Sequence, residues 1–281
     1  MSIELDNTLT GLSVLLTRPA GQATGLTRLI EEHGGKVSLL PLIEIEAIQD
    51  GPDFERIKSA ILALDNYAAA IFVSTNAATI GMEWIDRYWP QLPAGLAAYA
   101  VGPGTGNLLQ QFSWPVHYPA TGITSEDLLA LPGMRDVKGK RVALFRGQGG
   151  RELLASTLRE RGARVDYIEL YRRLEPRYDP AQVLTQLRDD EVNAIVTTSP
   201  QILQALLALG VNGNGGDDKA SAALISLLRQ LPVIVPSQRV RELALAAGIK
   251  EVIDAGGADD ATVVRALAQI RDRQHAGDGQ Q

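Results

Sequence analysis

Residues 14–37 read VLLTRPAGQATGLTRLIEEHGGKV, and residues 142–165 read VALFRGQGGRELLASTLRERGARV. The two stretches align without a gap, each residue of the first matching the residue 128 positions later (142 − 14), so that Arg18 falls on Arg146. Each begins and ends with an apolar, β-branched run and has an amphipathic helical period between them, which predicts a strand–helix–strand unit. Any two such units share part of this pattern, but a repeat of half a chain indicates two domains of similar fold.

The same alternation continues along the rest of the chain. Residues 71–74 and the helix after them match 195–199, and residues 99–109 resemble 233–243, so the order of the units repeats as well. Alternating strands and helices are typical of an α/β protein with largely parallel sheets. The expected strands lie at 13–17, 36–40, 69–74, 97–101, 141–145, 164–168, 194–198, 233–236 and 251–254.

Two segments differ from this pattern. Residues 41–48 (PLIEIEAI) and 169–176 (ELYRRLEP) extend strands in which apolar and charged residues alternate. Such alternation is expected of exposed ribbons that cross from one domain to the other.

The composition of the chain excludes several classes of function. The 281 residues carry a formal charge of −6, so no overall basic field attracts nucleic acid or an anionic membrane. The absence of cysteine excludes disulfides and thiolate chemistry, and the three histidines have no metal-binding spacing. The first eleven residues are polar, and no apolar run reaches the roughly 18 residues of a membrane span. We therefore expect a cytoplasmic protein without a metal.

Candidate binding residues follow the expected strands, where open α/β sheets bind their ligands. Helix N-termini and arginine forks both favour anions, so a set of them suits a ligand with many anionic groups. The alternative for each hydroxyl is an ordinary helix cap. The candidate substrate-binding residues are Arg18, Ser74, Thr75, Thr105, Ser125, Arg146, Gly147, Arg151, Ser199, Ser237, Gln238 and Arg239.

Familiar nucleotide and hydrolase motifs are incomplete. Two G-x-G starts, at 102–104 and 147–149, lack the third glycine, and neither a phosphate-binding P-loop nor G-x-S-x-G occurs. Chemistry carried mainly by the substrate is then favoured. A non-catalytic protein that clamps an anion, or a nucleotide- or S-adenosylmethionine-dependent enzyme, remains an alternative.

Tyr171 lies in the second crossing segment. Strand alternation from Val165 places it on the same face as Tyr167 and Glu169, opposite Ile168 and Leu170. Its phenol has the chemistry to hydrogen-bond a leaving hydroxyl, although tyrosine in a strand is also a common packing residue.

Several short motifs together resemble the uroporphyrinogen-III synthase family, and the likeness extends from about residue 12 to residue 270. The motifs are 14–19 (VLLTRP), 33–35 (HGG) leading to 40–43 (LPLI), 72–74 (FVS), 100–105 (AVGPGT), 124–128 (TSEDL), 146–154 (RGQGGRELL), 161–162 (RG) leading to 170–173 (LYRR), and 236–237 (PS).

This resemblance implies two Rossmann-like or flavodoxin-like domains joined by a two-stranded β-ladder. One domain would comprise residues 1–40 with 177–281, the other 47–168, with linkers at 41–46 and 169–176. The implied substrate is hydroxymethylbilane, which carries eight carboxylates, loses water to form an azafulvene and closes with inversion of ring D. The resemblance also implies a monomer that needs no cofactor, with transient contact to hydroxymethylbilane synthase, the preceding enzyme.

Individual residue roles follow from the same resemblance. It gives Tyr171 the catalytic role of assisting loss of the hydroxyl, and it carries the hydroxyl positions of the family over to Ser74, Thr105, Ser199 and Ser237. The chain departs from the family after Ser74, where Thr75 replaces a frequent proline, and at 235–237, where VPS replaces Gly-Pro-Thr.

Overall fold

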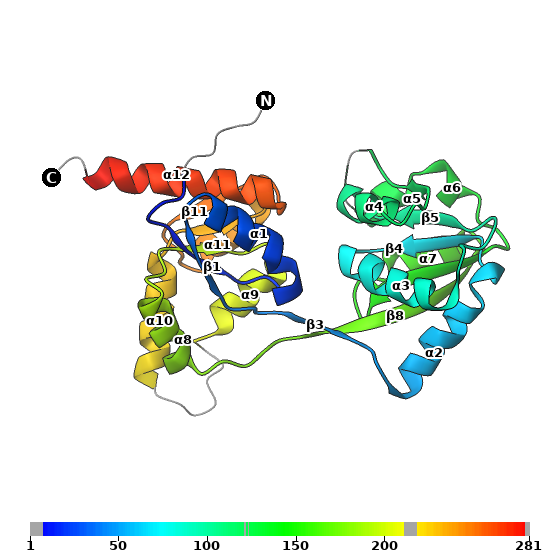
Figure 1. The fold of residues 1–281 in the computed structure, drawn as a ribbon, viewed down its shortest axis with the longest axis horizontal. Coiled ribbons are helices and arrows are strands. Elements are labelled where there is room, and N and C mark those ends of the chain that lie inside the picture. Colours follow the sequence, from blue (N-terminus) through cyan, green and yellow to red (C-terminus); the bar gives the residue numbers. More distant parts are fainter. Residues whose placement is uncertain (1–7, 121, 123, 211–217, 279–281) are drawn as a thin grey trace. The chain divides into compact units, whose positions relative to one another are not determined.

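The computed structural model describes residues 8–120, 122, 124–210 and 218–278, which group into two compact units (Figure 1). Unit 1 consists of Met1–Glu44 and Leu174–Gln281, and unit 2 of Ile45–Arg173. Unit 2 is therefore inserted into the sequence of unit 1. The glycine-rich stretch at 211–217 lies outside the described residues.

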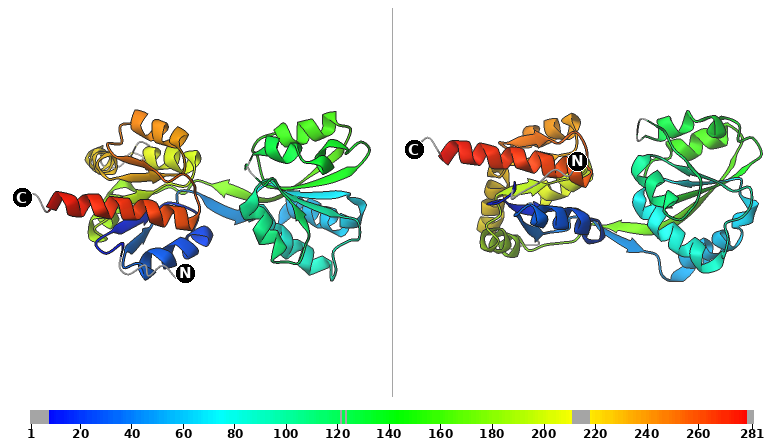
Figure 2. Two further views of the ribbon diagram at one scale, coloured as in Figure 1. Left: turned by 90° about the horizontal axis from the view of Figure 1, so that it is seen from above. Right: turned by 45° about the horizontal axis from the view of Figure 1, so that its top comes forward.

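Unit 1 is built on a parallel sheet with strand order β11-β10-β9-β1-β2. Helices α1 and α12 cover one face, where Leu26, Ile30 and Leu267 are buried, and α9 and α11 lie on the other (Figure 2). The strands are β1 (Ser13–Leu16), β2 (Lys36–Leu39), β9 (Ala194–Val196), β10 (Val233–Val235) and β11 (Val252–Asp254). The helices are α1 (Ala20–Glu32), α8 (Pro180–Asp189), α9 (Pro200–Ala208), α10 (Asp218–Gln230), α11 (Gln238–Ala246) and α12 (Asp260–Asp278).

The second sheet has the strand order β3-β8-β7-β4-β5-β6, and its strands from β8 to β6 run parallel. Its strands are β3 (Glu44–Ala47), β4 (Ala69–Phe72), β5 (Ala97–Ala100), β6 (Val116–His117), β7 (Arg141–Gly147) and β8 (Arg164–Leu174). The helices of unit 2 are α2 (Gly51–Leu62), α3 (Thr75–Tyr88), α4 (Pro103–Gln110), α5 (Ser125–Leu129), α6 (Pro132–Arg135) and α7 (Leu153–Glu160), with a 3₁₀ turn at Leu64–Asn66.

The internal repeat is confirmed at the level of strand pairing. The order β2-β1-β9-β10-β11 in unit 1 corresponds to β8-β7-β4-β5-β6 in unit 2. Ser13 pairs with Lys36, and Arg141 pairs with Arg164, so the 128-residue offset holds for both strands.

Two alignments within the repeat were each wrong by a residue. Residues 99–109 correspond to 234–244 and not to 233–243, since the helix N-caps Gly102 and Ser237 are equivalent.

The other shift concerns the strand before Ser74. Ile195 pairs with Leu15 of β1, and the residue that pairs with the equivalent Ala143 is Ala70, not Ile71. Ser74 therefore corresponds to Ser199, and both are helix N-caps. The errors arose because two neighbouring apolar residues fit a buried parallel strand equally well.

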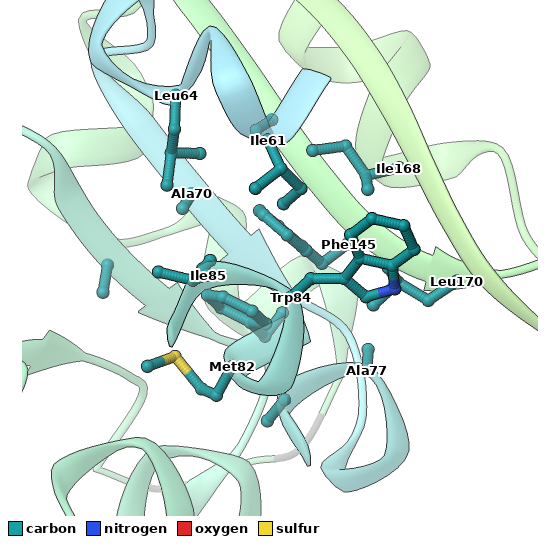
Figure 3. Close-up of a cluster of buried hydrophobic side chains, with 14 of the residues drawn as sticks. Ile61, Leu64, Ala70, Ala77, Met82, Trp84, Ile85, Phe145, Ile168 and Leu170 are labelled. Atoms are coloured by element: carbon teal, nitrogen blue, oxygen red, sulfur yellow. The ribbon is translucent and has the colours of Figure 1, made fainter. Parts of the chain in front are cut away.

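Helix α3 packs closely on the sheet of unit 2 (Figure 3). Figure 3 shows Trp84 of α3 beside Phe145, Ile168 and Leu170 of the strands. Phe145 is also stacked on Phe72, with ring centroids 4.4 Å apart. Helices α5 and α7 contribute to a separate apolar cluster, which also contains Tyr167 of β8. The two clusters mark the two faces of the sheet.

A β-bulge in β8 overturns the predicted orientation of Tyr171. Between Arg146 and Gly147 the pairing advances one residue on β7 but two on β8, from Glu169 to Tyr171. The extra residue reverses the alternation beyond it. Tyr171 consequently packs in the same cluster as Ile168 and Leu170, and not in that of Tyr167.

A polar cluster ties the amino ends of β7 and β8 to the segment before β4. The Tyr67 hydroxyl donates to Asp166 Oδ2 at 2.9 Å, and Arg141 Nη2 donates to the same oxygen at 2.7 Å. The guanidinium carbon of Arg141 also lies 4.5 Å from the centroid of the Tyr67 ring. Burial, followed by the hydrogen bond to Asp166, raises the pKa of Tyr67 from 10.0 to about 12.

Replacing Tyr67 with phenylalanine is expected to reduce the alkaline sensitivity of the protein. The unfolded phenol ionises near pH 10 and the folded one near pH 12, so its stabilising contribution is complete below pH 10 and is lost between these values. Urea unfolding at pH 9 to 12 should show a shallower decline in the variant. Tyr88→Phe serves as the control, because the phenol of Tyr88 has no hydrogen bond to the described residues. Equal declines in Tyr67→Phe and wild type would contradict the expectation.

Candidate functional site

In unit 2, the predicted residues gather along the carboxyl edge of the parallel strands. Ser74 and Thr75 follow β4, Thr105 lies in the first turn of α4 after β5, and Arg146 to Arg151 end β7 and lead to α7. Because parallel strands end at the same edge of a sheet, these segments are neighbours. Ser125 begins α5, but the hydroxyl that caps this helix belongs to Thr124.

In unit 1, Arg18 follows β1, Ser199 follows β9, and Ser237 to Arg239 follow β10. Ser199 Oγ accepts a hydrogen bond from the Ile202 N–H at 3.1 Å, as an N-cap does. Ser237 occupies the N-cap position of α11 without a side-chain hydrogen bond to the helix. Each unit thus presents its own row of predicted residues.

Ser74 connects the start of α3 with Tyr171 of β8. Its Oγ accepts a hydrogen bond from the Ala77 N–H at 3.2 Å and lies 3.0 Å from the Tyr171 hydroxyl oxygen. Tyr171 has 0% of its surface exposed, whereas Ser74 is half-buried. The Tyr171 ring lies directly on Gly147, where an added Cβ would come within 2.5 Å of Tyr171 Cε2. A residue without a side chain is therefore required opposite the tyrosine.

Arg146 is held inside unit 2, with only 4% of its surface exposed. Its Nε donates to the Gly147 carbonyl at 3.2 Å, its Nη1 lies 3.4 Å from Glu152 Oε1, and its guanidinium carbon is 4.9 Å from the Tyr167 ring centroid. Arg159 contacts the same ring at 5.0 Å. Arg146 therefore lies at the predicted edge of the sheet, but the carboxylate that it faces is Glu152 of the protein and not a ligand.

Glu152 and Tyr167 complete this cluster and were not predicted as site residues. The Tyr167 hydroxyl donates a short hydrogen bond to Glu152, and this bond, followed by the charge of Arg146, lowers the pKa of the carboxyl. Burial and the same hydrogen bond raise the pKa of Tyr167. At neutral pH the carboxylate is therefore ionised and the phenol neutral.

Arg18 has a similar environment in unit 1. It is 7% exposed, and its Nη1 lies 2.6 Å from Asp260 Oδ1 while its Nη2 donates to the Ala258 carbonyl at 3.2 Å. The partner carboxylate lies at the start of α12, 242 residues away in sequence. The two repeat-related arginines are thus both buried and both paired, but with carboxylates from different elements.

Replacing Asp260 with asparagine is expected to lower the free energy of unfolding by about 1–3 kcal/mol, because it leaves the charge of the buried Arg18 without its counter-ion. Urea unfolding near neutral pH measures the loss. Asp272→Asn is the control on the same helix, since Asp272 is exposed and its ion pair with Arg271 is 3.9 Å long. Equal losses in the two variants would contradict the expected role of Asp260.

The remaining predicted cations are exposed. Arg151 and Arg239 have no ion pair or hydrogen bond within the described part of the chain, so they can meet a ligand without giving up a partner. Gln238 instead donates to Glu242 at 3.2 Å. The Thr105 side chain, although buried, likewise has no hydrogen bond to a described residue.

A second polar network adjoins Tyr171. Gln148 Nε2 donates to Asp53 Oδ2 at 3.0 Å, and Arg172 Nε donates to Gln148 Oε1 at 3.0 Å. Gln148 and Arg172 lie within motifs already quoted, but nothing in the sequence connects either of them with Asp53. These contacts fix the loop after β7 against the start of α2.

No group of three histidine, aspartate or glutamate side chains within the described ranges is arranged to hold a metal ion. Each helix described is too short or too polar to cross a membrane.

The fold defines the class: a two-unit α/β protein with parallel sheets covered by helices on both faces. The family model described as "Uroporphyrinogen-III synthase HemD" matches residues 25–263. The chain is also similar to uroporphyrinogen-III synthase of Escherichia coli strain K12, at 31% identity over 91% of this chain and 100% of the relative. The chain belongs to the uroporphyrinogen-III synthase family.

Other relatives agree with this assignment. The Proteus mirabilis uroporphyrinogen-III synthase is 34% identical over 70% of this chain and 98% of its own length. A mutant uroporphyrinogen III synthase from Thermus thermophilus has a similar fold, with a TM-score of 0.56, 19% identity and coverage of 92% of this chain and 100% of that one. The predicted fold class, α/β with parallel sheets, is confirmed.

Proposed function

We propose that the chain converts hydroxymethylbilane into uroporphyrinogen III, with loss of water and inversion of ring D. The observation that carries this proposal is the family match over residues 25–263, supported by full-length similarity to the Escherichia coli enzyme. The residues at the carboxyl edges of the two sheets also suit this substrate. A substrate with eight carboxylates needs cationic and N–H partners, and the carboxyl edges of both units offer exposed arginines and helix starts.

The two kinds of arginine have different proposed roles. Arg151 and Arg239, which are exposed, bind substrate carboxylates directly. Arg18 and Arg146, which are buried and paired, shape the loops after β1 and β7 and contribute positive potential to them. A substrate carboxylate reaches these two arginines only by competing with Asp260 or Glu152.

Catalysis is proposed to rest on positioning and oriented hydrogen bonds. Hydroxymethylbilane closes by itself to the uninverted isomer, so the protein must both accelerate closure and direct it to the substituted carbon of ring D. Correct positioning supplies roughly 7–11 kcal/mol in favourable cases. The hydrogen-bonded pair Ser74–Tyr171 is placed at the carboxyl edge of unit 2, where it assists loss of the hydroxyl.

The decisive experiment is incubation of the purified protein with hydroxymethylbilane and separation of the product isomers after oxidation. The proposal requires the type III isomer, formed without an added metal, nucleotide or S-adenosylmethionine. Type I product alone, at the rate of a protein-free control, would contradict it. A requirement for an added nucleotide or S-adenosylmethionine would favour the alternative enzyme class.

Three further expectations accompany this proposal: a cytoplasmic location, which follows from the sequence composition, and a monomeric state and transient contact with hydroxymethylbilane synthase, which follow from the family resemblance. Light scattering over a range of concentrations measures the molecular mass. Coupled assays with and without a trapping excess of free substrate test whether the intermediate passes directly between the two enzymes.

A further inference from the structure

The position of the hydrogen atoms in the Ser74–Tyr171 pair can be deduced from its surroundings. Tyr171 has no exposed surface, so water cannot accept its hydroxyl proton, and a buried O–H without an acceptor is costly. Among the described residues, Ser74 Oγ is its hydrogen-bond partner, at 3.0 Å. Tyr171 is therefore the donor and Ser74 the acceptor.

This assignment fixes the direction of the serine hydroxyl. A serine oxygen accepts up to two hydrogen bonds and donates one. Its two acceptor positions are taken by Tyr171 and by the Ala77 N–H, which lies at 3.2 Å. Within the described part of the chain, the Ser74 proton has no acceptor, and the residue is half-buried rather than enclosed. The proton is left for a ligand.

We infer that Ser74, and not Tyr171, donates the hydrogen bond to the departing hydroxyl of the substrate, and that Tyr171 is a positioning residue behind it. The inference rests on the proposed function, which supplies the reaction. Two donors on the serine oxygen polarise its own O–H, which strengthens the bond that it makes outward. The tyrosine thus acts through the serine.

The step that Ser74 assists is loss of water from the hydroxymethyl group. The C–O bond breaks, and its electron pair leaves with the oxygen. The attached pyrrole loses its N–H proton and becomes an azafulvene, and in net terms that proton completes the water molecule. Ser74 stabilises the negative charge that develops on the leaving oxygen, and it ends in the protonation state in which it began.

The closing experiment compares the kcat for type III product among Ser74→Gly, Ser74→Thr, Tyr171→Phe and the double variant. Glycine is a tolerated N-cap, so Ser74→Gly removes the hydroxyl with little damage to α3. We expect a loss of about 100-fold in Ser74→Gly, recovery in Ser74→Thr, and a loss of at most about tenfold in Tyr171→Phe. Because Tyr171 acts through Ser74, the double variant should match Ser74→Gly within about twofold.

Two controls make the result interpretable. Asp179→Ala removes a comparable cap, that of α8, a helix that carries none of the proposed binding residues, and should leave kcat unchanged. The infrared C–O stretch of labelled Tyr171 reports whether the phenol donates, and the donor signature should disappear in Ser74→Gly. This measurement needs no substrate.

Several outcomes would overturn the inference: a larger loss in Tyr171→Phe than in Ser74→Gly, a double variant with multiplied losses, or an infrared band typical of an accepting phenol. Failure of the proposed function has a different signature. The wild-type protein would then yield only type I product, whereas the infrared measurement would still decide which residue donates.

Discussion

Replacing Gly147 with alanine is expected to destabilise unit 2 by about 1–3 kcal/mol and to lower the yield of type III product. The added methyl group would come within 2.5 Å of Tyr171 Cε2 and 2.7 Å of Tyr171 Cζ. Such distances are shorter than carbon atoms tolerate, and the tyrosine is enclosed on all sides, so its ring has no room to turn away. Either β7 and β8 separate or the ring moves, and both changes disturb the hydrogen bond to Ser74.

Urea unfolding and the isomer assay measure the two effects of Gly147→Ala. Gly104→Ala is the matched control for stability, since no atom lies within 4 Å of a Cβ at that position and the residue belongs to helix α4. The control should be neutral or slightly stabilising. If Gly147→Ala kept wild-type stability and product yield, the close packing of Tyr171 on the backbone would be irrelevant to the site.

Replacing Arg146 with methionine is expected to cost about 1–3 kcal/mol of stability and to raise KM at least about tenfold. The substitution removes the donor to the buried Gly147 carbonyl and the charge that faces Glu152, while methionine fills much of the same volume. The activity loss follows from the positive potential that Arg146 contributes to the loop after β7. Steady-state kinetics with hydroxymethylbilane and urea unfolding are the measurements.

Arg159→Met provides the control for Arg146→Met. Arg159 also contacts Tyr167, at 5.0 Å from the ring centroid, and carries the same charge, but it is exposed. Its replacement should leave KM within about twofold of the wild type. Equal changes of KM in the two variants would mean that net charge matters and the position of Arg146 does not.

Most of the fold could be predicted because it depends on local periodicity. Apolar strands alternating with amphipathic helices predict parallel α/β sheets, and the repeat between 14–37 and 142–165 anticipated the shared strand order. Strand β6 was missed, since two residues, Val116 and His117, give no measurable period.

The site was harder to predict because its contacts are distant in sequence. The motifs located the arginines and hydroxyls correctly at the carboxyl edges, yet the pairing of Arg18 with Asp260 spans 242 residues and has no local signal. The predicted orientation of Tyr171 was wrong because the alternation of residues along one strand cannot reveal a bulge. A bulge depends on how β8 pairs with β7. Whether the predicted residues bind substrate is a question for the variants proposed above.

The insertion of unit 2 between the two parts of unit 1 sets an order for synthesis on the ribosome. All strands of the second sheet have been translated once residue 174 has emerged, whereas β1 must wait for its neighbour β9 at 194–196, and the first sheet lacks its edge until β11 at 252–254 is made. During that interval β1, β2 and the apolar face of helix α1 have no complete core to join. Nascent unit 1 therefore exposes apolar surface for longer during synthesis than unit 2 does.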